Sequence, residues 1–110
     1  IDYVNASPDW GVGATILGAQ KLNGSLAEFF FHTTYLDISV EANRRKFISA
    51  ALKPVDLGAN GSTPLGVQPL VYHRIAKGAA ATTFADELGS GGGPWTITGT
   101  LDIASNSPSD

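Results

Sequence analysis

The sequence predicts an all-β protein: a small antiparallel β-sandwich or partly closed barrel of six to seven strands, with at most one short helix. Three observations predict this fold class. Apolar and polar residues alternate with a period of two in several segments, turn-forming residues recur at short intervals, and only one segment has a helical pattern. A chain of 110 residues forms one domain, because cores usually divide only in chains more than about twice as long.

The clearest alternation runs over 95–103, where apolar residues occupy one face and mostly threonines the other. A second strand is predicted over 34–41. The run of three phenylalanines at 29–31 directly precedes it and is apolar on both faces. Such a strand must be covered on both sides, by a second sheet or by a neighbouring subunit.

The remaining segments continue the β pattern. The Asn-Gly pair at 23–24 lies between two apolar runs and predicts a hairpin turn, since both residues tolerate a positive φ. Further strands are predicted over 47–53 and 67–77. Pro69 cannot donate to a ladder, which places the start of the latter at a sheet edge. Residues 54–66, with two prolines and three glycines, are expected to form a long exposed loop.

Helical character is confined to 79–88, with Gly89 as a stop signal. Residues 1–12 are expected to form an N-terminal arm and residues 104–110 a frayed tail. The chain opens with Ile1, without an initiator Met or a basic-then-apolar signal segment. This favours a proteolytic cut before Ile1 or a fragment of a longer protein, and both interpretations stay open.

Charge is sparse along the whole chain. Charged residues make up 15% of the sequence, against about 25% in an average soluble domain, and the net charge is −3. This balance gives no general attraction to nucleic acid or to an anionic membrane. No apolar run approaches the roughly 20 residues that span a bilayer. Without cysteine there is no disulfide framework, thiolate metal site or thiol nucleophile.

No arrangement of residues predicts an active site. His32 and His73 belong to different segments, and neither lies in a motif that places two ligands on one metal. Asp86 and Glu87 are neighbours, so on a helix their side chains diverge by about 100° and form no facing acid pair. We therefore expect a protein that is not an enzyme and that has no metal or cofactor.

Two kinds of surface site are predicted. Arg44, Arg45 and Lys46 form the basic cluster of the chain, and on a turn they would contact a phosphate backbone or an acidic partner; the alternative is a solvated turn. Asn23 and Asn60 lie in Asn-Gly-Ser triplets on predicted hairpin tips. These triplets fit the glycosylation acceptor pattern, and they are explained as well by Asn-Gly turns.

Sparse charge and strands that are apolar on both faces indicate that much of the protein surface forms interfaces with other subunits. The expected function is a structural subunit that self-assembles or packs on a particle or filament: a viral coat or decoration protein, or a pilin-like surface subunit. Its partners would be copies of itself or other structural subunits, and its location the virion or the cell surface. The expected interface residues are Phe29, Phe30, Phe31 and Trp10.

A second expected function is a secreted carbohydrate-binding β-sandwich. Aromatic faces suit the C–H faces of sugars, and Trp10 lies in a turn where its ring would be accessible. Trp95 lies in the core-facing phase of its predicted strand and is expected to be buried.

Two short motifs resemble a stretch of the small RNA-bacteriophage coat proteins. They are the runs 23–29 and 43–47, the second leading to Pro54. In that family, an Asn-Arg-Lys-aromatic segment opens a strand of the RNA-facing sheet. The spacing between the motifs is shorter here. The family also ends in two helices that clasp the dimer partner, whereas this chain ends in the predicted strand 95–103, and we infer no membership.

Overall fold

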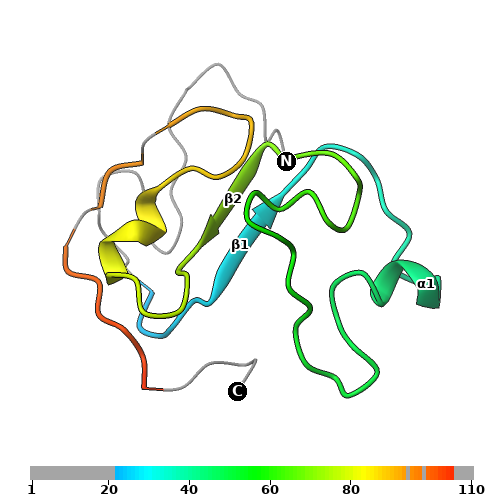
Figure 1. Ribbon diagram of the computed structural model, residues 1–110, viewed down its shortest axis with the longest axis horizontal. Coiled ribbons are helices and arrows are strands. Elements are labelled where there is room, and N and C mark those ends of the chain that lie inside the picture. Colours follow the sequence, from blue (N-terminus) through cyan, green and yellow to red (C-terminus); the bar gives the residue numbers. More distant parts are fainter. Residues whose placement is uncertain (1–21, 94, 98, 106–110) are drawn as a thin grey trace.

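The computed structural model describes residues 22–93, 95–97 and 99–105. Four elements occur in this part of the chain, and the remainder forms turns and irregular segments (Figure 1). In chain order they are β1 (Glu28–Phe31), α1 (Glu41–Arg44), β2 (Val71–Arg74) and the 3-10 helix η1 (Ala81–Ala85).

Strands β1 and β2 form a two-stranded antiparallel sheet in which Phe30 lies opposite Tyr72 and Phe29 opposite His73. Successive side chains of a strand point to opposite faces. Tyr72 and His73 are therefore buried on different sides of the sheet. The Tyr72 ring packs edge-on against Phe30, with ring centres 6.3 Å apart. The small core of the described residues is thus built around β2.

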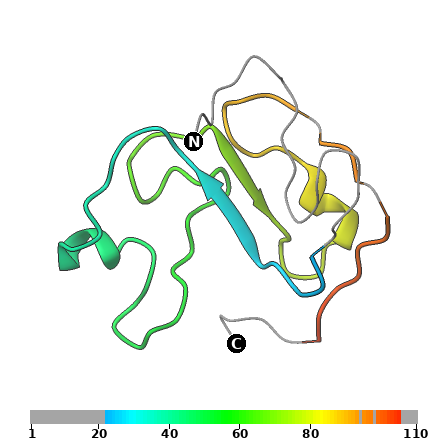
Figure 2. The same cartoon turned by 180° about the vertical axis from the view of Figure 1, so that it is seen from behind.

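Each face of β2 is covered by a different segment. On the Tyr72 face, Gly61 has a φ of +74°, and a Cβ there would lie 2.9 Å from the Tyr72 ring, so this close approach requires glycine. On the other face, the His73 ring lies 5.7 Å from the Phe84 ring and 4.7 Å from the Trp95 ring. Figure 1 and Figure 2 show η1 beside β2, on the side away from α1.

The outer edge of β2 is closed by the carboxylate of Glu87. Its Oε1 accepts hydrogen bonds from the backbone N–H groups of Tyr72 (2.8 Å) and Gly89 (2.7 Å). Its Oε2 accepts a hydrogen bond from the Trp95 indole (3.1 Å). The backbone N–H of Leu88 donates to the Tyr72 carbonyl (2.9 Å). Glu87 thus takes the place that a third strand would have at this edge.

The predicted sandwich or barrel of six to seven strands is wrong. The described residues hold two strands in one open sheet and two short helical elements. The segment 34–41 fails as a strand because the Asp37 carboxylate accepts hydrogen bonds from the N–H and hydroxyl of Ser39, which turns the chain ahead of α1. In 95–103, the described residues include Gly99 with a φ of +100°, which interrupts an extended strand.

Other predicted elements agree in part with the structure. β2 lies within the predicted strand 67–77 but is shorter and begins only after Pro69, and η1 within 79–88 is a 3-10 helix in place of the predicted α-helical segment. The predicted strand 47–53 contributes only the isolated bridge between Ile48 and Pro54.

The loop expected over 54–66 has no helix or strand, and it is not wholly exposed, since Leu57, Gly61 and Pro64 are buried. The N-terminal arm 1–12 lies outside the described residues, as does the tail from 106 to 110.

Replacing Glu87 by Ala should lower the free energy of unfolding by at least about 3 kcal/mol, because three N–H donors would lose their acceptor. Urea unfolding followed by circular dichroism measures this change. The matched control is Asp86→Ala at the exposed neighbour, which should change the value by less than about 0.5 kcal/mol. Equal losses in the two variants would contradict the role given to Glu87.

Candidate interaction surface

Few of the large apolar side chains in the described residues are buried. Leu57 and Tyr72 are buried, and the others are half-buried or exposed. Eleven large hydrophobic side chains are exposed: Leu22, Leu26, Tyr35, Ile38, Val40, Ile48, Leu52, Val67, Leu70, Leu101 and Ile103. Single exposed apolar residues are ordinary, but a set this large beside so small a core marks a surface for contact.

Five of these side chains gather in one part of the fold, which we call the α1 lobe and define as residues 35–55. Tyr35 is 84% exposed, Leu52 80% and Ile38 66%, and Val40 and Ile48 are also exposed. Figure 1 and Figure 2 show the lobe extending from the β1 side of the sheet, away from η1. The α1 lobe therefore presents apolar side chains that the rest of the described chain does not cover.

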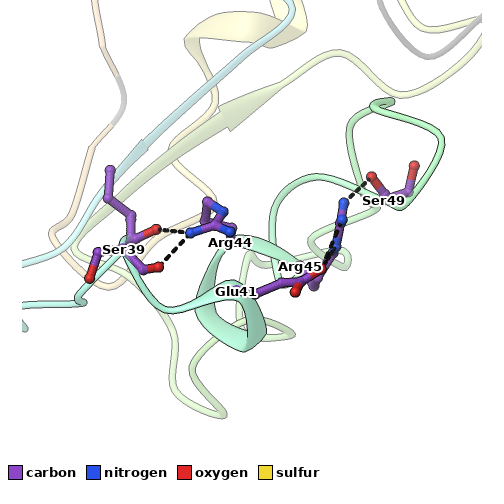
Figure 3. Close-up of polar contacts among 6 residues, drawn as sticks. Ser39, Glu41, Arg44, Arg45 and Ser49 are labelled. Atoms are coloured by element: carbon purple, nitrogen blue, oxygen red, sulfur yellow. Dashed lines mark hydrogen bonds and ion pairs between the residues drawn. The ribbon is translucent and has the colours of Figure 1, made fainter.

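Polar contacts inside the lobe fix its shape (Figure 3). The Arg44 guanidinium donates through Nη1 to the carbonyl oxygens of Ile38 (2.9 Å) and Ser39 (2.6 Å). The Asn43 side chain donates to the Asp37 carbonyl (2.9 Å). These bonds satisfy carbonyl groups of the turn before α1, so they hold Ile38 in its exposed position.

Arg45 links α1 to the turn that follows it (Figure 3). Its guanidinium forms an ion pair with Glu41 (Nη2 to Oε1, 3.0 Å) and donates to the Ser49 carbonyl (2.8 Å). The Ser49 carbonyl also accepts from the N–H of Leu52 (3.0 Å). Leu52 has a φ of +60°, a left-handed conformation that is rare for a residue with a branched side chain. The tip of the lobe thus exposes a leucine in a strained conformation.

The structure places the predicted basic cluster at the end of α1. Arg44, Arg45 and Lys46 are brought together there, but both guanidinium groups bind groups of the lobe itself. The carboxylate of Glu41 offsets the charge of Arg45, and Lys46 is half-buried. A phosphate would have to compete with these intramolecular bonds, so contact of the cluster with nucleic acid stays a prediction.

The other predicted site residues are spread over the fold. Phe29, Phe30 and Phe31 form most of β1 and are half-buried, with the Phe30 ring 5.5 Å from that of Phe47. The two predicted glycosylation residues, Asn23 and Asn60, are exposed. Trp10 lies outside the described residues. Trp95 is half-buried, and its indole is bound to the Glu87 carboxylate.

A polar network at the start of β1 had no signal in the sequence, because its members come from distant segments. The Tyr72 hydroxyl donates to Glu28 Oε1 (3.3 Å), and Arg74 pairs with Asp56 (3.0 Å). Burial raises the pKa of the Glu28 carboxyl above its ordinary value, against the lowering effects of the Tyr72 hydrogen bond and the Arg74 charge. The contacts within the chain therefore compensate the charge of Glu28 only in part.

His73 and Glu87 form a buried pair, with 3.5 Å between Nε2 and Oε2 and side chains 2% and 4% exposed. Among the described residues, neither ring nitrogen of His73 has a hydrogen-bond partner. A reacting group must be reached by its substrate, and the rings of Phe84 and Trp95 pack on this imidazole. The pair therefore serves packing around β2.

The described residues also lack two other features, a cluster of metal ligands and a membrane-spanning helix. Within them, no group of three or more His, Cys, Asp or Glu residues could hold a metal ion. No helix in the same part of the chain has the length and apolar character needed to cross a membrane.

The chain matches no protein-family model, no curated protein and no solved structure. The resemblance to the RNA-bacteriophage coat proteins therefore rests on its two motifs alone. The second motif, 43–47, lies at the end of α1 and in the turn after it, where the family has the beginning of a strand.

Replacing Leu52 by Asn should raise the free energy of unfolding by about 1 kcal/mol, because Asn adopts the left-handed conformation at lower cost. Urea unfolding measures the change. The control Ile38→Asn makes the same kind of substitution at an exposed residue without a positive φ, and it should shift the value by less than about 0.5 kcal/mol. A loss of stability in Leu52→Asn would contradict the strain at this turn.

Proposed function

We propose that this protein is a non-enzymatic structural subunit that self-assembles or packs on a particle or filament, as a viral coat or decoration protein or a pilin-like surface subunit does. One observation carries the proposal: of the large hydrophobic side chains in the described residues, eleven are exposed and two are buried, and the others are half-buried. Contact with copies of itself or with other structural subunits would cover these side chains. The corresponding location is the virion or the cell surface.

The small sheet supports it as well. β1 and β2 have four residues each, and a two-stranded sheet is marginally stable in water unless other elements pack on it. The segments around Gly61 and Glu87 pack on β2, whereas β1 is half-buried. A subunit that gains the rest of its packing from neighbours needs no larger core of its own.

A secreted carbohydrate-binding module is the second candidate function, and one observation favours it. Tyr35 is 84% exposed, so its ring can stack on a sugar, whereas the Trp95 indole is bound to Glu87. A glycan array separates the two functions. Glycan binding that disappears in Tyr35→Ala would favour the module over the structural subunit.

The proposal predicts that the protein associates with itself, and that the triple variant Tyr35→Ser, Ile38→Asn, Leu52→Asn weakens this association at least about tenfold. The variant removes the most exposed apolar side chains of the α1 lobe. Analytical ultracentrifugation over a range of concentrations measures the change.

The control Thr82→Asn alters an exposed polar residue outside the lobe and should associate like the wild type. A wild-type protein that stays monomeric at every concentration, with no particle or filament in electron micrographs, would contradict the proposed function.

A further inference from the structure

The backbone of β1 has one edge at which the described residues form no hydrogen bonds. Tyr72 directs its N–H to Glu87 (2.8 Å) and its carbonyl to Leu88 (2.9 Å), away from β1. Phe30 lies opposite Tyr72, so the two form the pair of the antiparallel ladder that exchanges no hydrogen bonds. The N–H and carbonyl of Phe30 therefore point away from β2. Among the described residues, no hydrogen bond reaches them.

The two outer edges of the sheet thus differ. The edge of β2 is closed by Glu87 and Leu88, whereas no hydrogen bond from the described part of the chain reaches the outward groups of Phe30 in β1. An open edge carries a row of unpaired donors and acceptors, and it pairs readily with a strand from another chain. Charged residues and prolines protect such edges in monomeric proteins. β1 consists of Glu28 and three phenylalanines, so its protection is slight.

We propose that β1 pairs in antiparallel orientation with β1 of a second copy of this chain, about a two-fold axis at Phe30. Phe30 then lies opposite Phe30 of the second copy, and Glu28 opposite its His32. The result is a continuous four-stranded sheet in the order β2, β1, β1, β2. This inference rests on the proposed self-assembly and identifies one contact through which it occurs.

The register follows from which backbone groups point outward. Alternation along β1 assigns the outward groups to residues 28 and 30, and continuing the strand by one residue adds 32. In a register centred on Phe30, residue 28 of each copy lies opposite residue 32 of the other, and the two copies of residue 30 lie opposite each other. All three outward residues are then paired. A shift by two residues in either direction leaves one outward residue of each copy unpaired.

Side-chain chemistry favours the same register. His32 accepts a hydrogen bond from the Thr34 N–H at Nδ1 (2.9 Å), so the neutral ring carries its proton on Nε2 and can donate there. Glu28 accepts the Tyr72 hydroxyl at Oε1, and among the described residues no hydrogen bond reaches its Oε2. Directly opposite side chains of an antiparallel pair lie on the same face and within reach of each other. The pairing gives each Glu28 a second donor.

Cysteine cross-linking tests the register, because the natural chain contains no cysteine. Ala27 and Thr33 are exposed and flank β1, and a pair that extends past both ends of the strand in this register brings them opposite each other with a Cα separation of about 4.5 Å, which a disulfide spans. The variant Ala27→Cys, Thr33→Cys should form a covalent dimer under mild oxidation, visible on a non-reducing gel. The matched control Ser25→Cys, Thr33→Cys shifts one cysteine by two residues and should form little covalent dimer.

The variant His32→Glu gives an independent measurement, since it places a carboxylate opposite Glu28 of the second copy. The dissociation constant of the dimer should rise at least about tenfold, because the repulsion occurs twice per dimer. Adding Glu28→Gln to this variant should recover most of the loss. Circular dichroism of each variant establishes that the monomer fold is kept.

The outcomes separate this inference from the proposed function. Selective cross-linking at residues 27 and 33, together with weaker association of His32→Glu, supports the β1 pair. A protein that associates but cross-links equally in both cysteine variants, or not at all, overturns the β1 pair and leaves self-assembly standing. A wild-type protein that never associates overturns both.

Discussion

The buried carboxylate of Glu87 is the contact on which the rest of the described structure depends. It gathers two backbone N–H groups and one indole N–H at the outer edge of β2, so the segment that follows η1 is tied to the sheet. Hydrogen bonds to a charged acceptor are stronger than those between neutral groups, and each of these donors would be costly to bury alone. Because Glu87 and Leu88 bind Tyr72 at this edge, no further strand of the described residues pairs with β2 there.

This arrangement explains why the core is so small. β2 is covered on both faces and at its outer edge, whereas β1 is half-buried and, among the described residues, pairs with β2 along one edge. The α1 lobe then adds apolar side chains to the outside, held there by bonds from Arg44 and Arg45 to backbone carbonyls. Burial within the chain is thus concentrated at one strand. The exposed apolar side chains of the described residues lie on the α1 lobe and on other segments outside the sheet. The backbone edge without hydrogen bonds from the described residues belongs to β1.

Local patterns predicted the segments that contain β1 and β2, because an aromatic run and the alternation over 67–77 are properties of short stretches. They failed at 34–41 and 95–103, where alternation is present but the described residues form no strand. Asp37 turns the first segment through its own side chain, and the second contains Gly99 with a positive φ. The role of Glu87 depends on Tyr72, 15 residues away, and no local pattern reports such a contact.

The symmetry of the proposed contact constrains how an assembly is built. An isologous pair of β1 strands uses the same surface on both copies, so it closes at two subunits. A particle or filament needs a second, different contact to continue beyond the dimer. Tyr35, Ile38 and Leu52 of the α1 lobe lie outside the strand that pairs and are exposed in the single chain. The dimer formed through the open edge would be the building block, and the apolar lobe would supply the contact that joins one dimer to the next.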